Sequence, residues 1–221
     1  MALDVLVESV RGRAFASAAA WPGWCRSGRD QEAALAALVG YTERFAAVVA
    51  LAGLSLPTGR AALTPRVVEQ LEGNTTTSFG APGQVAEHDR LPTSRAEAGR
   101  QAALVGAAWE AFDEVIARAP AELRKGPRGG GRDRDKIVAH VVSAEVAYAR
   151  KIGLRLREPP AADTAAVTTN RRAVLEVLAR PADGSILVEP SGWPPRYTAR
   201  RIAWHVLDHA WEVQDRSGPS P

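Results

Sequence analysis

The sequence predicts two units of different fold class, a small α+β module over residues 1–75 and an all-α, antiparallel four-helix bundle over residues 92–217. Three observations predict this division. The first third of the chain carries short strand-like runs, whereas the last part carries long runs with helical periodicity. The stretch between them, from residue 72 to 91, is rich in Gly, Asn, Thr and Pro, which predicts a linker over residues 76–91.

Within the module, each element has a local signal. The dipeptide before Arg13 contains Gly12 and suits a hairpin turn between two strand-like runs. Asp30 is a good N-cap for a helix that stops before Gly53, and Pro65 precedes a returning strand. The predicted elements are two strands, a short third strand, one helix and a last strand, at residues 4–10, 13–20, 25–28, 31–52 and 66–71.

The helices of the bundle are predicted in the same way. Ser94 and Glu97 form a capping-box pattern before an Ala-rich amphipathic run, and Pro194 and Pro195 precede the last helix. The predicted helices run from about 95 to 118, from Asp133 or Asp135 to about 153, from Thr169 or Asn170 to about 179, and from about 198 to 216. Four helices of this size favour an antiparallel bundle with a buried seam.

Composition and charge restrict the class of protein. The net charge of +3 is too small to indicate a nucleic-acid partner. No segment approaches the roughly 18 apolar residues of a membrane span, and the N-terminus lacks a secretory pattern. The single cysteine, Cys25, excludes an internal disulfide framework and suits a reducing compartment. These features predict a cytoplasmic protein without a membrane span.

Three of the four histidines can converge on one point. His205 and His209 are four residues apart on the last predicted helix, about 40° around its axis, so both imidazoles leave the same face. His140 lies on the second predicted helix, and packing of the two helices would bring the three rings together. Three imidazoles can hold one divalent ion and leave an open fourth position, as catalytic zinc sites do. The alternative is a hydrogen-bonded cluster without metal; His88 is predicted to be solvated.

A basic, glycine-rich run over residues 124–134 precedes the helix of His140. Glycine-rich backbone beside cationic side chains at a helix start can bind an anion. The candidate contacts are Arg128, Arg132 and Arg134, and the alternative is a solvated loop.

The last predicted helix is apolar on two sides. Trp204, Leu207 and Trp211 form a stripe almost opposite His205 and His209. Because such a patch is rarely left in water, we expect it to be buried against the N-terminal module or, as second choice, against another copy in a homodimer.

The arrangement of His140, His205 and His209 resembles the DinB-like superfamily of four-helix bundles. That superfamily places one metal-binding histidine on the second helix and an H-x-x-x-H pair on the last. The resemblance covers residues 92–217 and implies a divalent metal, with zinc or nickel expected first. Members include thiol-dependent transferases and the mycothiol-dependent maleylpyruvate isomerase, which implies a low-molecular-weight thiol such as mycothiol as cofactor.

The N-terminal module resembles the small HicB-type fold. The resemblance is carried by the turn Trp-Pro-Gly-Trp-Cys-Arg-Ser-Gly at residues 21–28 and the helix start at residues 30–35. A DNA-binding motif of the kind that accompanies HicB antitoxins is absent from the sequence, so an antitoxin role is not expected. Cys25 within the turn is interpreted as a packed residue rather than a thiol activated by Arg26.

Two functions follow as expectations. The first is a divalent-metal-dependent enzyme of the DinB-like thiol-transferase type, acting on a small-molecule substrate, with a metal-bound thiolate or water as nucleophile. Catalytic residues are not identified; Asp208 and Glu212 lie near His205 around the helix and are weak candidates for a general base. The second is a non-enzymatic, metal-stabilised binding or regulatory protein with a HicB-like interaction module.

Overall fold

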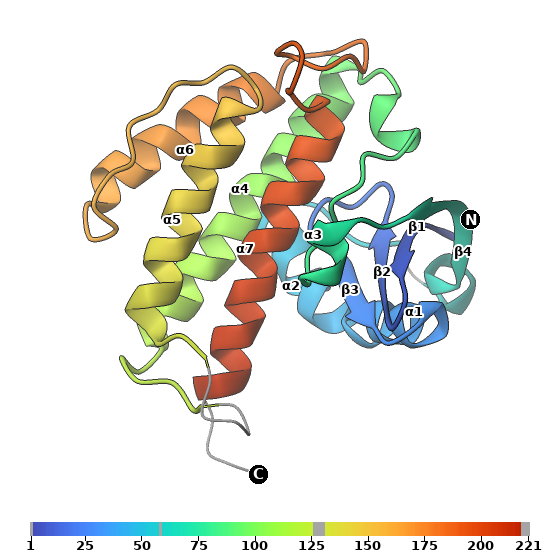
Figure 1. Ribbon diagram of the computed structural model, residues 1–221, viewed down its shortest axis with the longest axis horizontal. Coiled ribbons are helices and arrows are strands. Elements are labelled where there is room, and N and C mark those ends of the chain that lie inside the picture. Colours follow the sequence, from blue (N-terminus) through green and yellow to red (C-terminus); the bar gives the residue numbers. More distant parts are fainter. Residues whose placement is uncertain (1, 58, 126–130, 218–221) are drawn as a thin grey trace.

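The computed structural model describes residues 2–57, 59–125 and 131–217 and shows a mixed α+β protein (Figure 1). A four-stranded sheet occupies the N-terminal part, and helices make up most of the rest. The strands are β1, β2, β3 and β4, over Leu3–Val10, Arg13–Ala18, Cys25–Gly28 and Pro65–Glu72. Their order in the sheet is β3-β2-β1-β4, antiparallel except for the parallel pair of β1 and β4. The sequence predicted all four strands to within about two residues.

Two helices stand where the sequence predicted one, so that prediction was wrong. They are α1 and α2, over Gln31–Gly40 and Thr42–Leu51. Asp30 caps the first helix as predicted, accepting a hydrogen bond from the backbone N–H of Ala33 at 2.9 Å. The break lies at Tyr41, whose φ and ψ of −95° and 8° leave the helical region. The bend lets Leu38 and Phe45, both fully buried, face the same core.

Among the described residues, no single helix is long and apolar enough to cross a membrane. Helices α1 and α2 together meet that criterion by length and composition, but the pair is bent by 53° at its break.

The segment predicted as a linker has structure of its own. It contains the short helix α3 at Thr75–Ser78 and a 3₁₀ turn at His88–Arg90, and another 3₁₀ turn precedes β4 at Arg60–Leu63. The buried carboxylate of Glu8 accepts hydrogen bonds from the backbone N–H groups of Gly83 and Gln84, at 2.8 and 3.0 Å. Asp89 forms a buried ion pair with Arg200. The segment is therefore fastened both to the sheet and to the helical part.

Four long helices follow in the order α4, α5, α6 and α7, over Arg95–Arg118, Arg134–Arg150, Thr164–Leu178 and Pro195–Ser217. Helix α4 packs against α6 and α7, and α5 packs against the same two helices, which closes a ring of contacts (Figure 1). The first helix matches its predicted span, and Ser94 caps it by accepting from the N–H of Glu97. Helix α5 begins directly after Asp133, one of the two predicted starts, and ends a few residues before the predicted Gly153.

Helix α6 begins five residues before the predicted start at Thr169, which was therefore wrong. The cap is Asp163, whose carboxylate accepts from the N–H of Ala166 at 3.0 Å. Thr168 and Thr169 therefore lie inside the helix, where their hydroxyls donate to carbonyls one turn earlier, at 2.7 and 2.9 Å. Helix α7 also begins earlier than predicted, with Pro195 in its first turn, where proline loses no helical hydrogen bond.

The second apolar stripe of α7 is buried against the N-terminal part of the chain, which confirms the first-choice prediction. Trp204 and Trp211 are each 4% exposed, and Leu207 is fully buried. The ring of Trp204 meets Phe15 of β2 edge to face, with centroids 6.0 Å apart. Trp211 meets Tyr41 in the same way at 5.0 Å. The helix that carries two of the three histidines is thus held from behind by the module.

The turn before β3 makes this contact close. Gly23 has φ of +95°, and a Cβ at this position would lie 2.7 Å from Leu207 Cδ1, so only glycine fits without a shift. Trp24 donates from Nε1 to the carbonyl of Leu38 at 2.9 Å. Burial raises the pKa of the Cys25 thiol to about 12. Cys25 is therefore a packed residue, as predicted, and not a nucleophile.

Candidate metal centre

The three predicted histidines come together between α5 and α7. His140 projects from α5, and His205 and His209 project from one face of α7. Helices α5 and α7 pack against each other. One ring nitrogen of each residue lies within 4.8 Å of the other two. The Nε2 atoms of His140 and His205 are 3.2 Å apart. The helical spacing therefore placed the donors correctly, and the three-histidine cluster can hold a metal ion.

The geometry of the rings fits one shared ion. The ring centroids are 5.1 Å apart for His140 with each partner and 4.8 Å apart for His205 and His209. Tetrahedral nitrogen ligands at 2.0–2.1 Å from zinc are about 3.3 Å from one another. The pair of His140 and His205 already has that separation, and modest ring rotations would bring in the third nitrogen. The ring planes stand at 64° to 89° to one another, so the rings face one another edgewise rather than stacking.

Burial and neighbouring charges lower the pKa values of two of the three histidines, His140 and His205. Burial lowers the pKa of His205 well below its ordinary value of 6.5, and the nearby His209 and His140 lower it further. Burial also lowers the pKa of His140, with a contribution from His209. A neutral imidazole offers its lone pair, whereas an imidazolium cannot bind a cation. His140 and His205 are therefore ready to bind metal at neutral pH.

A carboxylate orients the third histidine. His209 donates from Nδ1 to Glu212 at 2.9 Å, and Glu212 also accepts from Arg216 at 2.6 Å. The hydrogen bond from His209 lowers the pKa of Glu212, so this group is ionised and can only accept. The tautomer of His209 is thereby fixed with Nε2 free for a ligand, which is how second-layer carboxylates serve metal sites.

The other candidate general base is also engaged. Asp208 accepts from Arg26 of β3 at 2.9 Å, and the guanidinium of Arg26 lies 4.0 Å from the ring centroid of Tyr41. Burial raises the pKa of Asp208. Both carboxylates that the sequence singled out are thus paired, Asp208 with an arginine and Glu212 with His209.

The cluster is closed from behind and partly open in front. His205 is buried, at 7% exposure, but His140 and His209 retain partial exposure. Among the described residues, no aspartate, glutamate or cysteine joins the three histidines as a further ligand. A metal ion held here would keep a coordination position for a molecule from outside the chain.

The three arginines predicted as anion contacts have different surroundings. Arg128 lies outside the described residues. Arg134 is engaged at the start of α5, donating to Asp135 at 2.8 Å and to the carbonyl of Ala119 at 2.9 Å. Arg132 is exposed, and its positive charge contributes to the lowered pKa of both His140 and His205. Arg132 is thus the member of this set that acts on the cluster.

The fourth histidine is not solvated as predicted. His88 lies in the fastened segment before α4, and its Nε2 atom is buried without a hydrogen-bond partner. Burial lowers its pKa. No local sequence signal shows this, because the turn is drawn inward by the ion pair of the neighbouring Asp89 with Arg200 of α7. His88 is not part of the three-histidine cluster.

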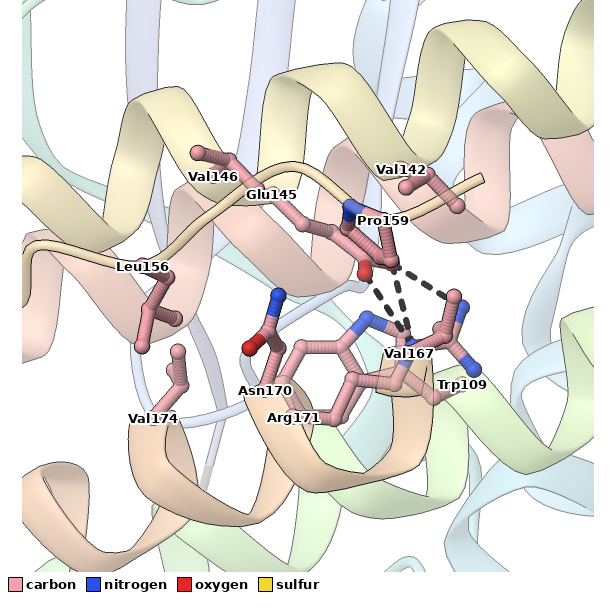
Figure 2. Close-up of a pocket in the computed structure, with 10 residues that line it drawn as sticks. All are labelled: Trp109, Val142, Glu145, Val146, Leu156, Pro159, Val167, Asn170, Arg171 and Val174. Carbon is pink, nitrogen blue, oxygen red and sulfur yellow. Dashed lines mark hydrogen bonds and ion pairs between the residues drawn. The ribbon is translucent and has the colours of Figure 1, made fainter. Parts of the chain in front are cut away.

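A second buried polar cluster lies about 140° around α5 from His140, and sequence reasoning missed it. Arg171 of α6 donates to Glu145 of α5 at 3.0–3.2 Å (Figure 2). It also donates to Asp113 of α4 at 2.8–3.0 Å. Glu145 and Arg171 also line a small, mostly apolar pocket into which Figure 2 shows Trp109 projecting. One signal was available: Glu145 follows the buried Val141 by four residues, so helical spacing places a carboxylate in the core.

Comparisons with known proteins identify no relative: no family model, curated protein or solved structure matches the chain. The resemblances to DinB-like bundles and HicB-type modules therefore stay predictions. Function must be inferred from the geometry of the three histidines.

Proposed function

We propose that the protein is a divalent-metal-dependent enzyme of the thiol-transferase type, with His140, His205 and His209 as the ligands of one ion. The observation that carries the proposal is the convergence of three imidazoles from two helices on a partly exposed point. Zinc and nickel are the expected ions, since both accept imidazole ligands. Such an ion supplies a Lewis acid that lowers the pKa of a thiol or water at the open position.

The residues of the chain divide the work of building this site. His205 and His140 stay unprotonated because burial disfavours their charged forms. Glu212 holds the ring of His209 in one tautomer and one orientation. Packing of α7 on the N-terminal module fixes the position of His205 and His209 relative to α5.

We further infer that α4 to α7 form a four-helix bundle of the DinB-like kind. The closed ring of helix contacts supports this inference, and so does the placement of one histidine on α5 and two on α7. A small thiol such as mycothiol is the proposed cofactor, and a small molecule the proposed substrate.

A second candidate function is a metal-stabilised binding or regulatory protein. The observation that favours it is the ion pair of Arg26 and Asp208, because Asp208 directly precedes the ligand His209 and connects it to the module. Metal binding at the cluster would then stabilise the contact between module and helices. The two candidates differ in whether a thiol can reach the ion.

Metal analysis of the purified full chain tests the proposal. Wild-type protein loaded with zinc or nickel should retain one ion per chain, whereas His205→Ala and His140→Ala should retain none and keep their helical circular dichroism. His88→Ala is the matched control, since this histidine lies outside the cluster and should leave metal content unchanged. Equal metal content in all four proteins would refute the proposed ligands.

Cobalt-loaded protein separates the two candidates. Addition of a low-molecular-weight thiol should change the visible absorption spectrum if the coordination position is open. An unchanged spectrum, together with loss of helicity in His205→Ala, would favour the metal-stabilised binding protein instead.

A further inference from the structure

One arginine of α7 has no acidic partner among the described residues. Arg196, Arg200 and Arg216 each pair with a carboxylate. Arg201 instead donates from Nη1 to the carbonyl of Pro82, and its buried Nε atom has no hydrogen-bond partner. A partly buried guanidinium with an unused donor is costly unless something else satisfies it.

Arg201 stands beside the three-histidine cluster. It precedes His205 by four residues and so lies on the same face of α7. Its guanidinium carbon is 5.7 Å from the ring centroid of Tyr148 on α5 and 4.9 Å from that of Trp204. The ring centroid of Tyr148 is in turn 5.6 Å from that of His205. The positive charge is therefore one aromatic ring away from the candidate ligands.

A second positive charge approaches from the opposite end. Helices α5 and α7 are antiparallel, because Tyr148 near the end of α5 meets Arg201 near the start of α7, whereas Gly131 before α5 lies against Arg216 near the end of α7. Arg132 follows Gly131, is exposed, and has no ion pair among the described residues. The nearby carboxylates do not offset these charges, since Asp208 and Glu212 already have partners of their own.

The surface next to Arg201 is also aromatic. Trp193, which precedes α7, lies with its ring centroid 5.3 Å from that of Tyr148, and both side chains are partly exposed. A partly exposed guanidinium without an acidic partner among the described residues suits the carboxylate of a ligand. Exposed faces of tyrosine and tryptophan suit the flat apolar body of a small molecule.

We propose that Arg201, Tyr148 and Trp193 form a subsite for the carboxylate and flat apolar body of a small organic acid that reaches the three-histidine centre. This inference rests on the proposed function and adds the class of ligand. Arg201 binds the carboxylate directly, and Arg132 raises the positive potential along the approach. The site thereby selects anionic over neutral ligands of the same shape.

Calorimetric titration of zinc-loaded full-length protein with benzoate tests the subsite. Benzoate should bind at least about 10-fold more tightly than benzyl alcohol, because only the carboxylate can form charge-assisted hydrogen bonds with Arg201. Arg201→Gln should weaken benzoate by about 10-fold or more, while zinc content stays at the wild-type level. Arg132→Gln should weaken benzoate by a smaller factor that disappears at high salt.

The controls keep the two proposals apart. Arg155→Gln removes an exposed charge from the connection after α5 and should leave benzoate binding unchanged. Arg201→Lys preserves the charge, so it should recover part of the affinity and it covers the case in which Arg201→Gln loses helicity. Zinc-loaded protein with equal benzoate affinity in wild type, Arg201→Gln and Arg201→Lys would overturn the subsite alone. A wild-type chain that takes up no zinc would overturn the proposed function and this inference with it.

Discussion

The two sides of α5 carry buried polar clusters of opposite character. Toward α4 and α6, Arg171 lies between Glu145 and Asp113, and each of its three nitrogens donates to a carboxylate. Toward α7, His140 meets two further imidazoles, and the Nδ1 atom of His205 is buried without a partner. In the first cluster every nitrogen of the guanidinium has a carboxylate partner, whereas the second retains an imidazole nitrogen without a partner.

The presence or absence of hydrogen-bond partners distinguishes a structural cluster from a candidate functional one more clearly than the burial of its side chains does. A buried polar group without a partner costs free energy, so a cluster that stays unsatisfied must be compensated by packing elsewhere. Here the compensation is visible, because α7 is anchored behind His205 by Trp204 and Leu207. Arg171 finds its carboxylate partners within the chain, whereas an ion shared by the three histidines has to come from outside it.

The largest expected effect is a loss of folding stability when the cluster around Arg171 is broken. Arg171→Ala leaves the buried carboxylate of Glu145 without a counter-charge, which should lower the free energy of unfolding by about 3–5 kcal/mol. Denaturant unfolding measures this loss. Arg172→Ala, at the exposed neighbouring position, should change the value by less than about 0.5 kcal/mol.

The same pair of variants sharpens the comparison when metal is measured. Folded Arg171→Ala protein should still bind one zinc ion per chain, because Arg171 contacts none of the histidines. If instead Arg171→Ala unfolds no more readily than Arg172→Ala, the cluster around Arg171 is not the structural support that the comparison with the three histidines assumes.

A smaller effect, on zinc affinity, is expected from a change at Glu212, the carboxylate that accepts a hydrogen bond from His209. Glu212→Gln removes the charge that holds His209 in its tautomer and should weaken zinc binding about 10- to 100-fold. Competition with a chelator gives the affinity. Asp215→Asn is the control, since this carboxylate lies on the same helix but pairs with Arg44. Equal zinc affinity in both variants would mean that Glu212 does not support the site.

The sequence predicted the three-histidine cluster because two of its three members lie on one helix, at a spacing that can be recognised locally. The spacing of His205 and His209 fixes their common face, and His140 needed only an adjacent helix. The strands were found for a similar reason, since short β-prone runs between turn residues are local signals. The capping box at Ser94 placed the start of α4 in the same local way.

The features that were missed depend on contacts between elements. Glu145 and Arg171 are 26 residues apart, and their pairing needs the rotation of two helices that periodicity does not specify. The break at Tyr41 directly follows Gly40, a poor helix former, but a single glycine did not indicate how α1 and α2 would pack their apolar faces on one core. The burial of His88 likewise follows from a tertiary ion pair, that of Asp89 with Arg200.

The smallest expected effect is a pH dependence of the metal-free protein. The pKa of His205 is lowered in the folded state, so below its unfolded value of about 6.5 the unfolded chain binds a proton that the folded chain does not. The free energy of unfolding should therefore be full above pH 6.5 and decline as the pH falls below it. One such group contributes at most about 1.4 kcal/mol per pH unit.

Denaturant unfolding between pH 5 and 7.5, with a chelator present, compares wild type with His205→Ala. Carboxylates and His88 titrate in both proteins, so their contribution cancels in the difference. Because the variant lacks the neutral imidazole, its stability should fall less steeply below pH 6.5 than that of the wild type. Bound zinc should flatten the wild-type curve near neutrality and steepen it where protons displace the metal. Identical slopes in the two metal-free proteins would show that the buried imidazole of His205 causes no such loss of stability at low pH. The contrast between the three histidines and the cluster around Arg171 would then rest on metal binding alone.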